Sequence, residues 1–353
     1  MWTTHPYSKT RAQNLIIAGL LAILGVLGLV SLSLGAYQIP FAQLLGVILD
    51  GLGVQGVAAE SQQVNVLLQI RLPRIVLATL IGGGLGVAGA SLQGMFRNPL
   101  VEPGLIGVSS GSALFAVIYL VLIAGSTGLW KSMSAFGLPL FAFVGGLIHV
   151  AAVYRLSRSQ GKTETSTLIL AGVAINALAG ALIGLTLFYA DDAALRSFTF
   201  WSLGDLGGAS WTKIPAALLL ILLPSLLLLR DYRALNALSL GEYEAFHMGV
   251  NVKQIKIKLL ITTALIVGVG VSLAGMIGFI GLIVPHLIRI GFGADHRLVL
   301  PGAFLLGAIL MNLADLIARL IVIPAEMPIG VVTALIGAPF FIWLIFNLNK
   351  PKR

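Results

Sequence analysis

The chain has 353 residues, of which 58% are hydrophobic and 10% charged, and its mean hydropathy is +1.00. A soluble domain cannot bury this much apolar surface, so the composition predicts a membrane protein. The absence of cysteine excludes disulfides and thiolate metal sites. In a membrane protein, the net charge of +9 is informative through its division between the two faces, and it does not indicate nucleic-acid binding.

Apolar runs predict an all-α polytopic membrane protein with ten spans in a single domain over 1–353. The first run is a retained span, since no convincing signal-peptide cleavage site accompanies it. The run over 255–291 has 37 residues, about 55 Å as one helix against a bilayer core of about 30 Å, so it must fold back near Gly275 or Gly278. The expected spans lie near 14–34, 75–95, 105–124, 136–154, 167–190, 214–229, 255–274, 276–291, 298–323 and 327–347.

The charges orient these spans. With both termini in the cytoplasm, 16 of the 22 Lys and Arg fall inside, as the positive-inside rule requires. The six left outside are Arg71, Arg74, Lys131, Arg196, Lys213 and Arg319. Arg71 and Arg74, in the sequence RLPR, stand directly before the second span, where one interpretation is that they anchor a helix end in lipid phosphates.

Small residues recur every fourth position in the second span, which places them on one helix face and allows another helix to approach closely. This ladder consists of Gly82, Gly86, Ala90 and Gly94. The same stretch matches the dinucleotide fingerprint GxGxxG, but it lacks the preceding strand and the following acidic residue. Helix packing is therefore the favoured interpretation.

Ionisable residues inside the spans are few, which weakens a proton- or sodium-coupled mechanism. Asp315 and Arg319 lie four residues apart on one helix face, and the sequence leaves open whether they form an interfacial ion pair or act in transport. No nucleophile–base constellation is present. The histidines lack the spacing of a zinc site; those considered are His149, His247 and His286.

The stretch Gly161-Lys162-Thr163 resembles the end of a phosphate-binding loop, but Leu156 stands where the first glycine would be needed. We therefore expect no nucleotide site, and any ATP that drives this protein must be hydrolysed by another polypeptide.

A cytoplasmic segment over 235–252 predicts a docking element. Ser239 to Glu242 resembles a capping box and Gly249 a helix stop, so residues 242–248 should form about two helical turns. This helix would expose side chains typical of a protein-docking surface, namely Tyr243, Phe246 and Met248. The alternative is a surface helix lying in the lipid headgroups.

Six stretches in chain order resemble the FecCD family, the permease subunits of type II ABC importers for iron-siderophore, haem and cobalamin uptake in bacteria. They are RLPR at 71–74, GASLQGMFRNPLVEPGLIGVSSG at 89–111, FWSLGDLGG at 200–208, LSLGEYEAFHMGVNV at 238–252, GFIGLIVPHLIR at 278–289 and ADLIARLIVIPAEMPIGVVTALIGAPFFIWLI at 314–345.

This resemblance implies a ten-helix permease of the bacterial inner membrane that works as a homodimer, with the pathway at the dimer interface. Two cytoplasmic ATPase subunits, which use ATP and Mg, would bind below, and one periplasmic substrate-binding protein above. The permease itself would bind no cofactor or metal and catalyse no reaction. The glycine-ladder helix and its dimer mate are expected to line the pathway.

The resemblance also carries residue roles. Arginines of the RLPR and ARL motifs, matched here to Arg71, Arg74 and Arg319, would receive acidic side chains of the binding protein. The segment around 238–252 resembles the coupling helices that seat in the ATPase. Its expected contact residues are Leu240, Gly241, Glu242, Glu244, Ala245, Met248 and Gly249. Asp205 departs from the serine of many relatives.

Among cargoes, haem is preferred because LNALSLGEYEAFHMGV and LRSFTFWSLGDLGGASW look most like haem permeases of the family. Ferric siderophore and cobalamin remain alternatives. A secondary active transporter is the alternative of a different class, and it would need an ion-coupling site that the sequence does not reveal.

Overall fold

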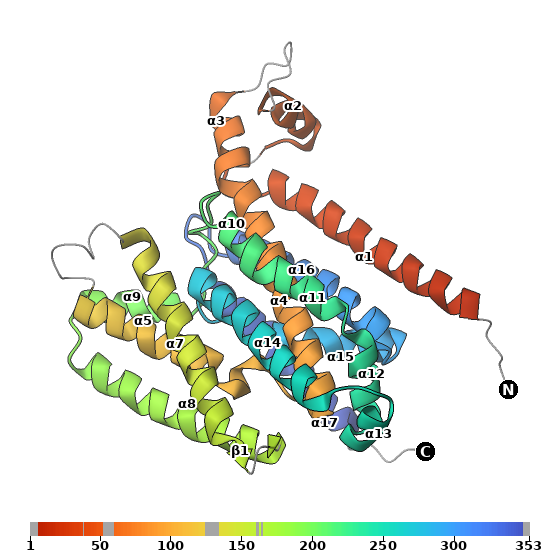
Figure 1. Ribbon diagram of the computed structural model, residues 1–353. Helices are drawn as coiled ribbons and strands as arrows, with labels where there is room; N and C mark the ends of the chain where they lie inside the picture. Colours follow the sequence, from red (N-terminus) through yellow and green to blue (C-terminus); the bar gives the residue numbers. More distant parts are fainter. Residues whose placement is uncertain are drawn as a thin grey trace.

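The computed structural model describes residues 6–37, 39–51, 60–123, 134–159, 162–163 and 165–348. The regular secondary structure within them is helical apart from an antiparallel pair of two-residue strands, β1 (Arg158–Ser159) and β2 (Lys162–Thr163). The helices, labelled as in Figure 1, are α1 (Pro6–Ser33), α2 (Phe41–Gly51), α3 (Ser61–Asn65), η1 (Val66–Arg71), α4 (Leu72–Phe96), η2 (Pro103–Ile106), α5 (Val108–Ile118), η3 (Tyr119–Ile123), α7 (Ser134–Leu156), α8 (Thr165–Phe188), α9 (Asp192–Ser202), α10 (Ile214–Ala217), η4 (Leu218–Leu222), α11 (Leu223–Leu229), α12 (Tyr232–Leu240), α13 (Glu242–His247), α14 (Val252–Ala274), α15 (Ile280–Phe292), α16 (His296–Leu320) and α17 (Ile329–Leu348).

Six helices in the described ranges are long and apolar enough to cross a membrane. They are Arg11–Ser33, Gln62–Phe96, Phe136–Leu156, Ser166–Phe188, Val252–Ala274 and His296–Leu320. A pair bent by 59°, Ile214–Leu229 with Tyr232–Leu240, would be a seventh crossing if taken together. Three shorter apolar helices are Val108–Ile123, Ile280–Phe292 and Ile329–Ile342. The chain is therefore an all-helical, multi-pass membrane protein.

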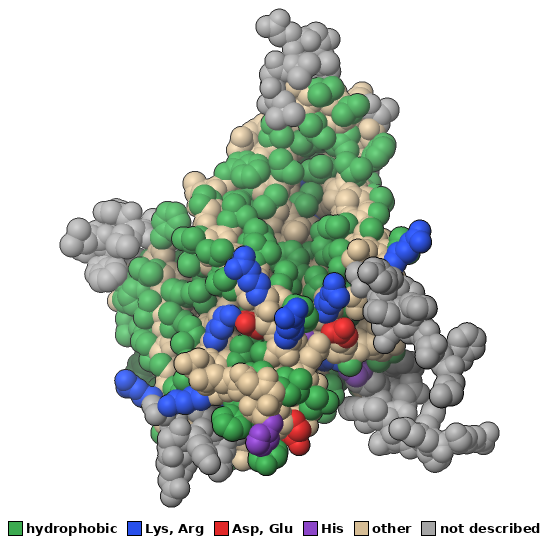
Figure 2. All heavy atoms as spheres, turned by 45° about the vertical axis from the view of Figure 1, so that its right-hand side comes forward, with side chains coloured by type: hydrophobic (Ala, Val, Ile, Leu, Met, Phe, Trp, Pro, Cys, Tyr) green, Lys and Arg blue, Asp and Glu red, His purple; other side chains and the backbone are tan. Residues whose placement is uncertain are grey.

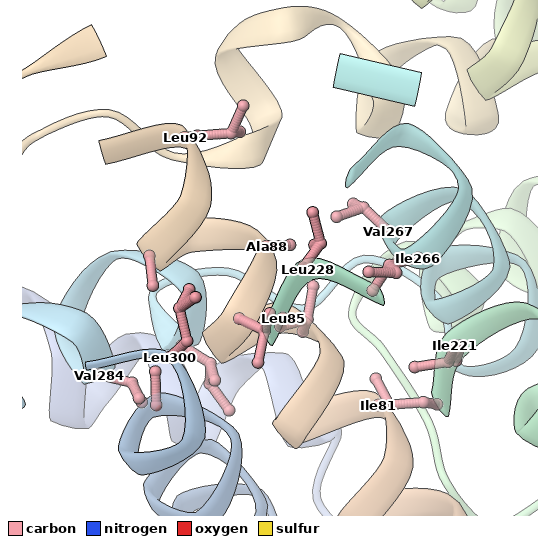
Figure 3. Packing of buried hydrophobic residues seen from close by; sticks show 14 of the residues in the cluster. Ile81, Leu85, Ala88, Leu92, Ile221, Leu228, Ile266, Val267, Val284 and Leu300 are labelled. Carbon is pink, nitrogen blue, oxygen red and sulfur yellow. The ribbon is translucent and has the colours of Figure 1, made fainter. Parts of the chain in front are cut away.

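Helix α4 forms the centre of the molecule. The apolar window in Gln62–Phe96 is 83% buried, whereas that of Arg11–Ser33 is 17% buried and that of Ser166–Phe188 is 22% buried. Helices α14, α15 and α16 pack around α4 (Figure 1), and Figure 3 shows their side chains meeting those of α4 and α11 in one hydrophobic cluster. A helix that is apolar all round must be enclosed by protein or lipid, and α4 is enclosed by protein.

Helices α5, α7, α8 and α9 form a second group beside this core (Figure 1). Glycines allow α5 and α7 to approach closely, since a Cβ added to Gly111 would lie 2.5 Å from the carbonyl oxygen of Gly145. This group contributes α9, whose last residues lie next to the loop that carries Asp205.

The fold-back expected near Gly275 or Gly278 is present. Helix α14 ends at Ala274, and Gly275 has a φ of +73°, a left-handed conformation that suits glycine. The stretch RLPR does not stand at the start of a helix. Helices α3, η1 and α4 run continuously from Ser61 to Phe96, so RLPR lies inside the helix.

Candidate docking and coupling sites

The three arginines expected at the outer face lie together where α1, α4 and α16 meet, at what we call the RLPR end. Arg71, Arg74 and Arg319 are buried, with 5%, 6% and 8% of their surface exposed. Asp315 is 1% exposed; its Oδ1 accepts from Nε of Arg74 at 2.8 Å and its Oδ2 from Nε of Arg319 at 3.0 Å. The pairing of Asp315 with Arg319, which the sequence left open, is formed.

Arg74 has a second carboxylate partner in Glu326, which lies between α16 and α17. Nη1 of Arg74 is 2.8 Å from Oε2 and 3.1 Å from Oε1 of Glu326, whose side chain is 43% exposed. Because a lone charge in an apolar interior is costly, these charges stabilise one another only as a set. Sequence reasoning missed Glu326, and its one signal was its place shortly after the ARL motif.

Arg71 forms no ion pair within the described ranges and donates to backbone carbonyls near the end of α1. The acceptors are the carbonyl oxygens of Leu32, Ser33 and Tyr37. Arg319 joins the same junction through Nη2, which donates to Oγ of Ser31 at 2.5 Å. These bonds satisfy helix-end acceptors and tie α1 to α4 and α16. In this conformation the three cations therefore face their own chain.

The predicted short docking helix is present as α13, at the opposite end of the molecule, which we call the α13 end (Figure 1). Large apolar side chains are exposed on and beside it: Leu240 at 65%, Tyr243 at 73%, Phe246 at 67% and Met248 at 63%. Ala245 is fully buried against the body. Exposed aromatic and Met side chains on an anchored helix are typical of a docking surface.

The capping box predicted from Ser239 and Glu242 is wrong. Ser239 lies within α12, and Oε1 of Glu242 pairs with Nζ of Lys256 on α14 at 2.5 Å. The turn into α13 is made by Gly241, whose φ is +143°. Gly249, with a φ of +84°, follows α13 at the expected stop.

Basic side chains gather at the α13 end. Figure 2 shows Lys and Arg side chains across the lower part of the molecule and a mainly hydrophobic surface above them. Described cations on segments at this end include Arg11, Arg97, Arg155, Arg230, Arg233, Lys253, Lys256, Lys258, Arg289 and Arg297. This distribution is the one that the positive-inside rule associates with a cytoplasmic face.

The glycine ladder of α4 lies against helices of the same chain. A Cβ added to Gly82 would lie 2.5 Å from the Cβ of Met311, and one added to Gly86 would lie 2.9 Å from the carbonyl carbon of Ala303, both on α16. Ala90 is fully buried. The ladder is thus covered in this conformation and would reach a pathway only if the neighbouring helices moved apart.

A cavity of about 320 Å³ lies at the RLPR end, beside the loop that carries Asp205. Oδ1 of Asp205 accepts from the N–H of Gly207 at 2.6 Å, and Nζ of Lys213 donates to a loop carbonyl at 2.7 Å. Burial lowers the pKa of Lys213, and the Asp205 carboxylate opposes that change. With Phe200 and Trp201 in its wall, the cavity presents aromatic surface and one ion of each sign.

No group of three or more His, Asp or Glu able to hold a metal ion occurs in the described part of the chain. The histidines weighed from sequence are separated, with His149 in α7, His247 in α13 and His286 in α15. Gly161 of the phosphate-loop-like stretch lies outside the described residues, and residues 162–163 form β2.

The chain thus forms an apolar helical body with a short helix at its basic end, and this helix exposes aromatic and Met side chains. The FecCD transport family matches residues 21–347 of the chain. The chain therefore belongs to the FecCD family, the permease subunits of type II ABC importers.

Several known proteins are similar to this chain over most of both sequences. The chain is 43% identical over 339 residues to the hemin transport system permease protein HmuU of Yersinia pestis, covering 96% of this chain and 97% of HmuU. It is 41% identical over 283 residues to the vitamin B12 import system permease protein BtuC of Escherichia coli, covering 80% and 84%. A solved inward-facing conformation of a metal-chelate type ABC transporter matches at 34% identity with a TM-score of 0.80, covering 94% and 99%.

These similarities identify the chain as a transport subunit of the inner membrane and not an enzyme. In importers of this kind, ATP hydrolysis belongs to a separate subunit.

Proposed function

We propose that this permease moves an iron chelate into the cytoplasm, with haem as its cargo. The observation that carries the proposal is the 43% identity to a hemin permease over nearly the whole of both chains. Ferric siderophore and cobalamin are the competing cargoes, and the second is supported by the 41% identity to a vitamin B12 permease over 80% of this chain.

Ten membrane crossings, with both chain ends in the cytoplasm, are part of the proposal. The six long helices, the bent pair and the three shorter apolar helices support this proposal, because each overlaps one of the ten expected spans. Residues 1–5 and 349–353 lie outside the described residues, as does Lys131. The orientation therefore rests on the basic side chains at the α13 end (Figure 2).

The proposed importer contains two copies of this chain, two ATPase subunits at the α13 end and one periplasmic binding protein at the RLPR end. Helix α13 would contact the ATPase through Tyr243, Phe246 and Met248. The ion pair of Glu242 with Lys256 ties α13 to α14, so a displacement of α13 by the ATPase would be transmitted to a long helix of the core.

Arg71, Arg74 and Arg319 remain the proposed docking residues. Because these side chains are buried and already have partners within the chain, docking requires an exchange of partners. An incoming carboxylate must replace Glu326, the exposed partner of Arg74. Such an exchange keeps the guanidinium paired throughout, and the arginine fork suits either carboxylate. It therefore avoids the larger penalty of uncovering an unpaired buried charge.

Uptake by proteoliposomes that contain the permease, its cognate ATPase and its binding protein tests the cargo. With ATP on the ATPase side, haem should accumulate faster than ferric siderophore or cobalamin. Faster uptake of either competitor would transfer the cargo assignment to that compound. Vesicles of the same lipid and permease without the ATPase control for haem that partitions into the bilayer.

A further inference from the structure

A second cavity, also of about 320 Å³, lies at the α13 end, where the last turns of α4 and α15 meet the start of α16 and the end of α12. Its wall includes Gln93, Gly94, Arg97, Ser239, Arg289 and His296. Two of these side chains are guanidiniums and one is an imidazole, and the lining residues include no carboxylate. The wall therefore carries positive charge without an acidic counterpart of its own.

Arg289, near the end of α15, is half-buried and forms no ion pair within the described ranges. Its guanidinium donates to Oε1 of Gln93 and, at 3.4 Å, to the carbonyl of Ala90. Gln93 is itself held by Leu282, whose carbonyl accepts from its Nε2 at 3.1 Å. These neutral partners fix the direction of the guanidinium but leave its charge uncompensated, whereas buried charges are ordinarily paired.

His296 is 3% exposed and has one ring nitrogen without a partner. Nδ1 lies 2.8 Å from Oδ1 of Asn236, an acceptor, so Nδ1 carries a proton. Nε2 is buried and makes no hydrogen bond within the described structure. It lies over Gly94, where an added Cβ would be 2.6 Å away. Because Nδ1 is already a donor, Nε2 donates only from the imidazolium, which a neighbouring anion stabilises.

The nearby carboxylate of Asp295 does not fill this role. Its Oδ1 accepts from Nδ2 of Asn236 at 2.8 Å and from the N–H of Arg297 at 2.9 Å, where it caps α16. Arg97, just after α4 and exposed, adds a second guanidinium to the wall. The cavity thus joins cations that form no ion pair within the described ranges to a buried ring nitrogen that has no hydrogen-bond partner there.

We propose that this cavity binds one oxyanion group, a carboxylate or a phosphate, held by Arg97, Arg289 and His296. Guanidiniums match the geometry of both groups. The group supplies the negative charge that the wall lacks and an acceptor for Nε2. Two sources can bring it to this end of the molecule: a phospholipid headgroup, and a propionate of haem as it leaves the permease. The second source rests on the proposed function.

Titration of the purified, full-length permease with inorganic phosphate, followed by calorimetry, tests the site. Wild type should bind saturably, and Arg97→Gln combined with His296→Gln should weaken binding about tenfold or more. Arg97→Gln alone changes an exposed residue and should weaken binding to a smaller extent, which keeps the test open if the double variant fails to fold. Arg233→Gln removes an exposed guanidinium from α12 at the same end and should bind as wild type does.

Two further probes separate the sources. If wild type binds phosphatidylglycerol and Arg97→Gln does not, the occupant is a lipid headgroup. If wild type prefers haem to its dimethyl ester and Arg97→Gln loses this preference, the occupant is a haem propionate. Weakened phosphate binding without either preference supports a free oxyanion as the occupant. Equal binding by Arg97→Gln and Arg233→Gln, or no binding of any probe by wild type, overturns the proposal. None of these measurements requires transport, so they remain informative if haem uptake fails.

Discussion

Asp315 is the residue on which the RLPR end depends most. Its carboxylate is 1% exposed and pairs with Arg74 at 2.8 Å and with Arg319 at 3.0 Å. Asp315→Asn keeps the shape of the side chain and removes its charge, leaving two buried guanidiniums with Glu326 as their remaining carboxylate. We expect the free energy of unfolding to fall by about 3–5 kcal/mol, measured by SDS titration in mixed micelles.

Glu326→Gln is the matched control, because it removes a carboxylate from the same cluster at a side chain that is 43% exposed. Exposed ion pairs contribute little, so the loss should be about 0–1 kcal/mol. Equal losses in the two variants would contradict the argument that burial sets the strength of this cluster.

Glu326→Gln also tests the carboxylate exchange proposed for docking. Without Glu326, Arg74 has lost its internal competitor on the exposed side, so the binding protein should dock more tightly and dissociate more slowly. Surface plasmon resonance on permease in nanodiscs measures both. Arg74→Gln should weaken docking under the same conditions, and unchanged docking in both variants would exclude Arg74 as a contact for the partner.

Glu102 gives the protein a pH dependence of known sign. Burial raises the pKa of its carboxyl above the ordinary value of 4.5. The folded protein therefore keeps this proton at pH values where the unfolded chain has lost it. The associated stabilisation is present below pH 4.5 and disappears as the pH rises through the raised pKa. Wild type should lose stability relative to Glu102→Gln across this window in SDS titrations; a constant difference would show that Glu102 is not the cause.

Among contacts between helices, the sequence predicted that another helix approaches the glycine ladder of α4 closely. At Gly86 an added Cβ would lie 2.9 Å from the carbonyl carbon of Ala303, so Gly86→Ala should destabilise by about 1–3 kcal/mol. Gly180→Ala in α8 is the control, because nothing lies within 4 Å of its added Cβ. It should be neutral or stabilise by up to about 1 kcal/mol. Unfolding in SDS distinguishes them, and equal effects would show that the contact does not limit packing.

Hydropathy predicts the long helices well because bilayer thickness limits their length. The break after Ala274 follows from that argument, since one helix over 255–291 would be too long. Hydropathy did not show where the helix of the second span begins, because that helix starts at Ser61, well before the apolar run at 75–95. The helix continues through RLPR; the π-helical turn η1 ends at Arg71, two residues before Pro73, which has no N–H to donate.

A single sequence does not show which side chains pair with one another when they are far apart along the chain. The family resemblance singled out Arg74 as a docking residue. It did not show that Arg74 pairs with the carboxylates of Asp315 and Glu326, which lie 241 and 252 positions away. At α13, Gly249 and the apolar pattern predicted the helix, whereas the role of Glu242 was missed because its partner Lys256 lies 14 positions away on another helix. The family resemblance and local patterns therefore singled out candidate residues, and the fold was needed to show their pairing.

In the whole molecule, the two candidate interfaces lie at opposite ends and α4 joins them. It runs from the arginine cluster at the RLPR end to the basic cavity at the α13 end (Figure 1). A packed helix moves as a unit, so an event at either end can shift the other. This arrangement suits an importer in which a binding protein and an ATPase act on opposite faces of one membrane subunit.

ATP-driven haem uptake by proteoliposomes, compared between wild type and Tyr243→Ser combined with Phe246→Ser, tests the central claim most directly. Both substitutions lie on the exposed face of α13 and should leave the fold intact. We expect wild type to require ATP and the ATPase, and the variant to lose ATP-driven uptake along with ATPase binding. Uptake that persists without the ATPase and follows a proton or sodium gradient, or full ATP-driven uptake by the variant, would contradict this account.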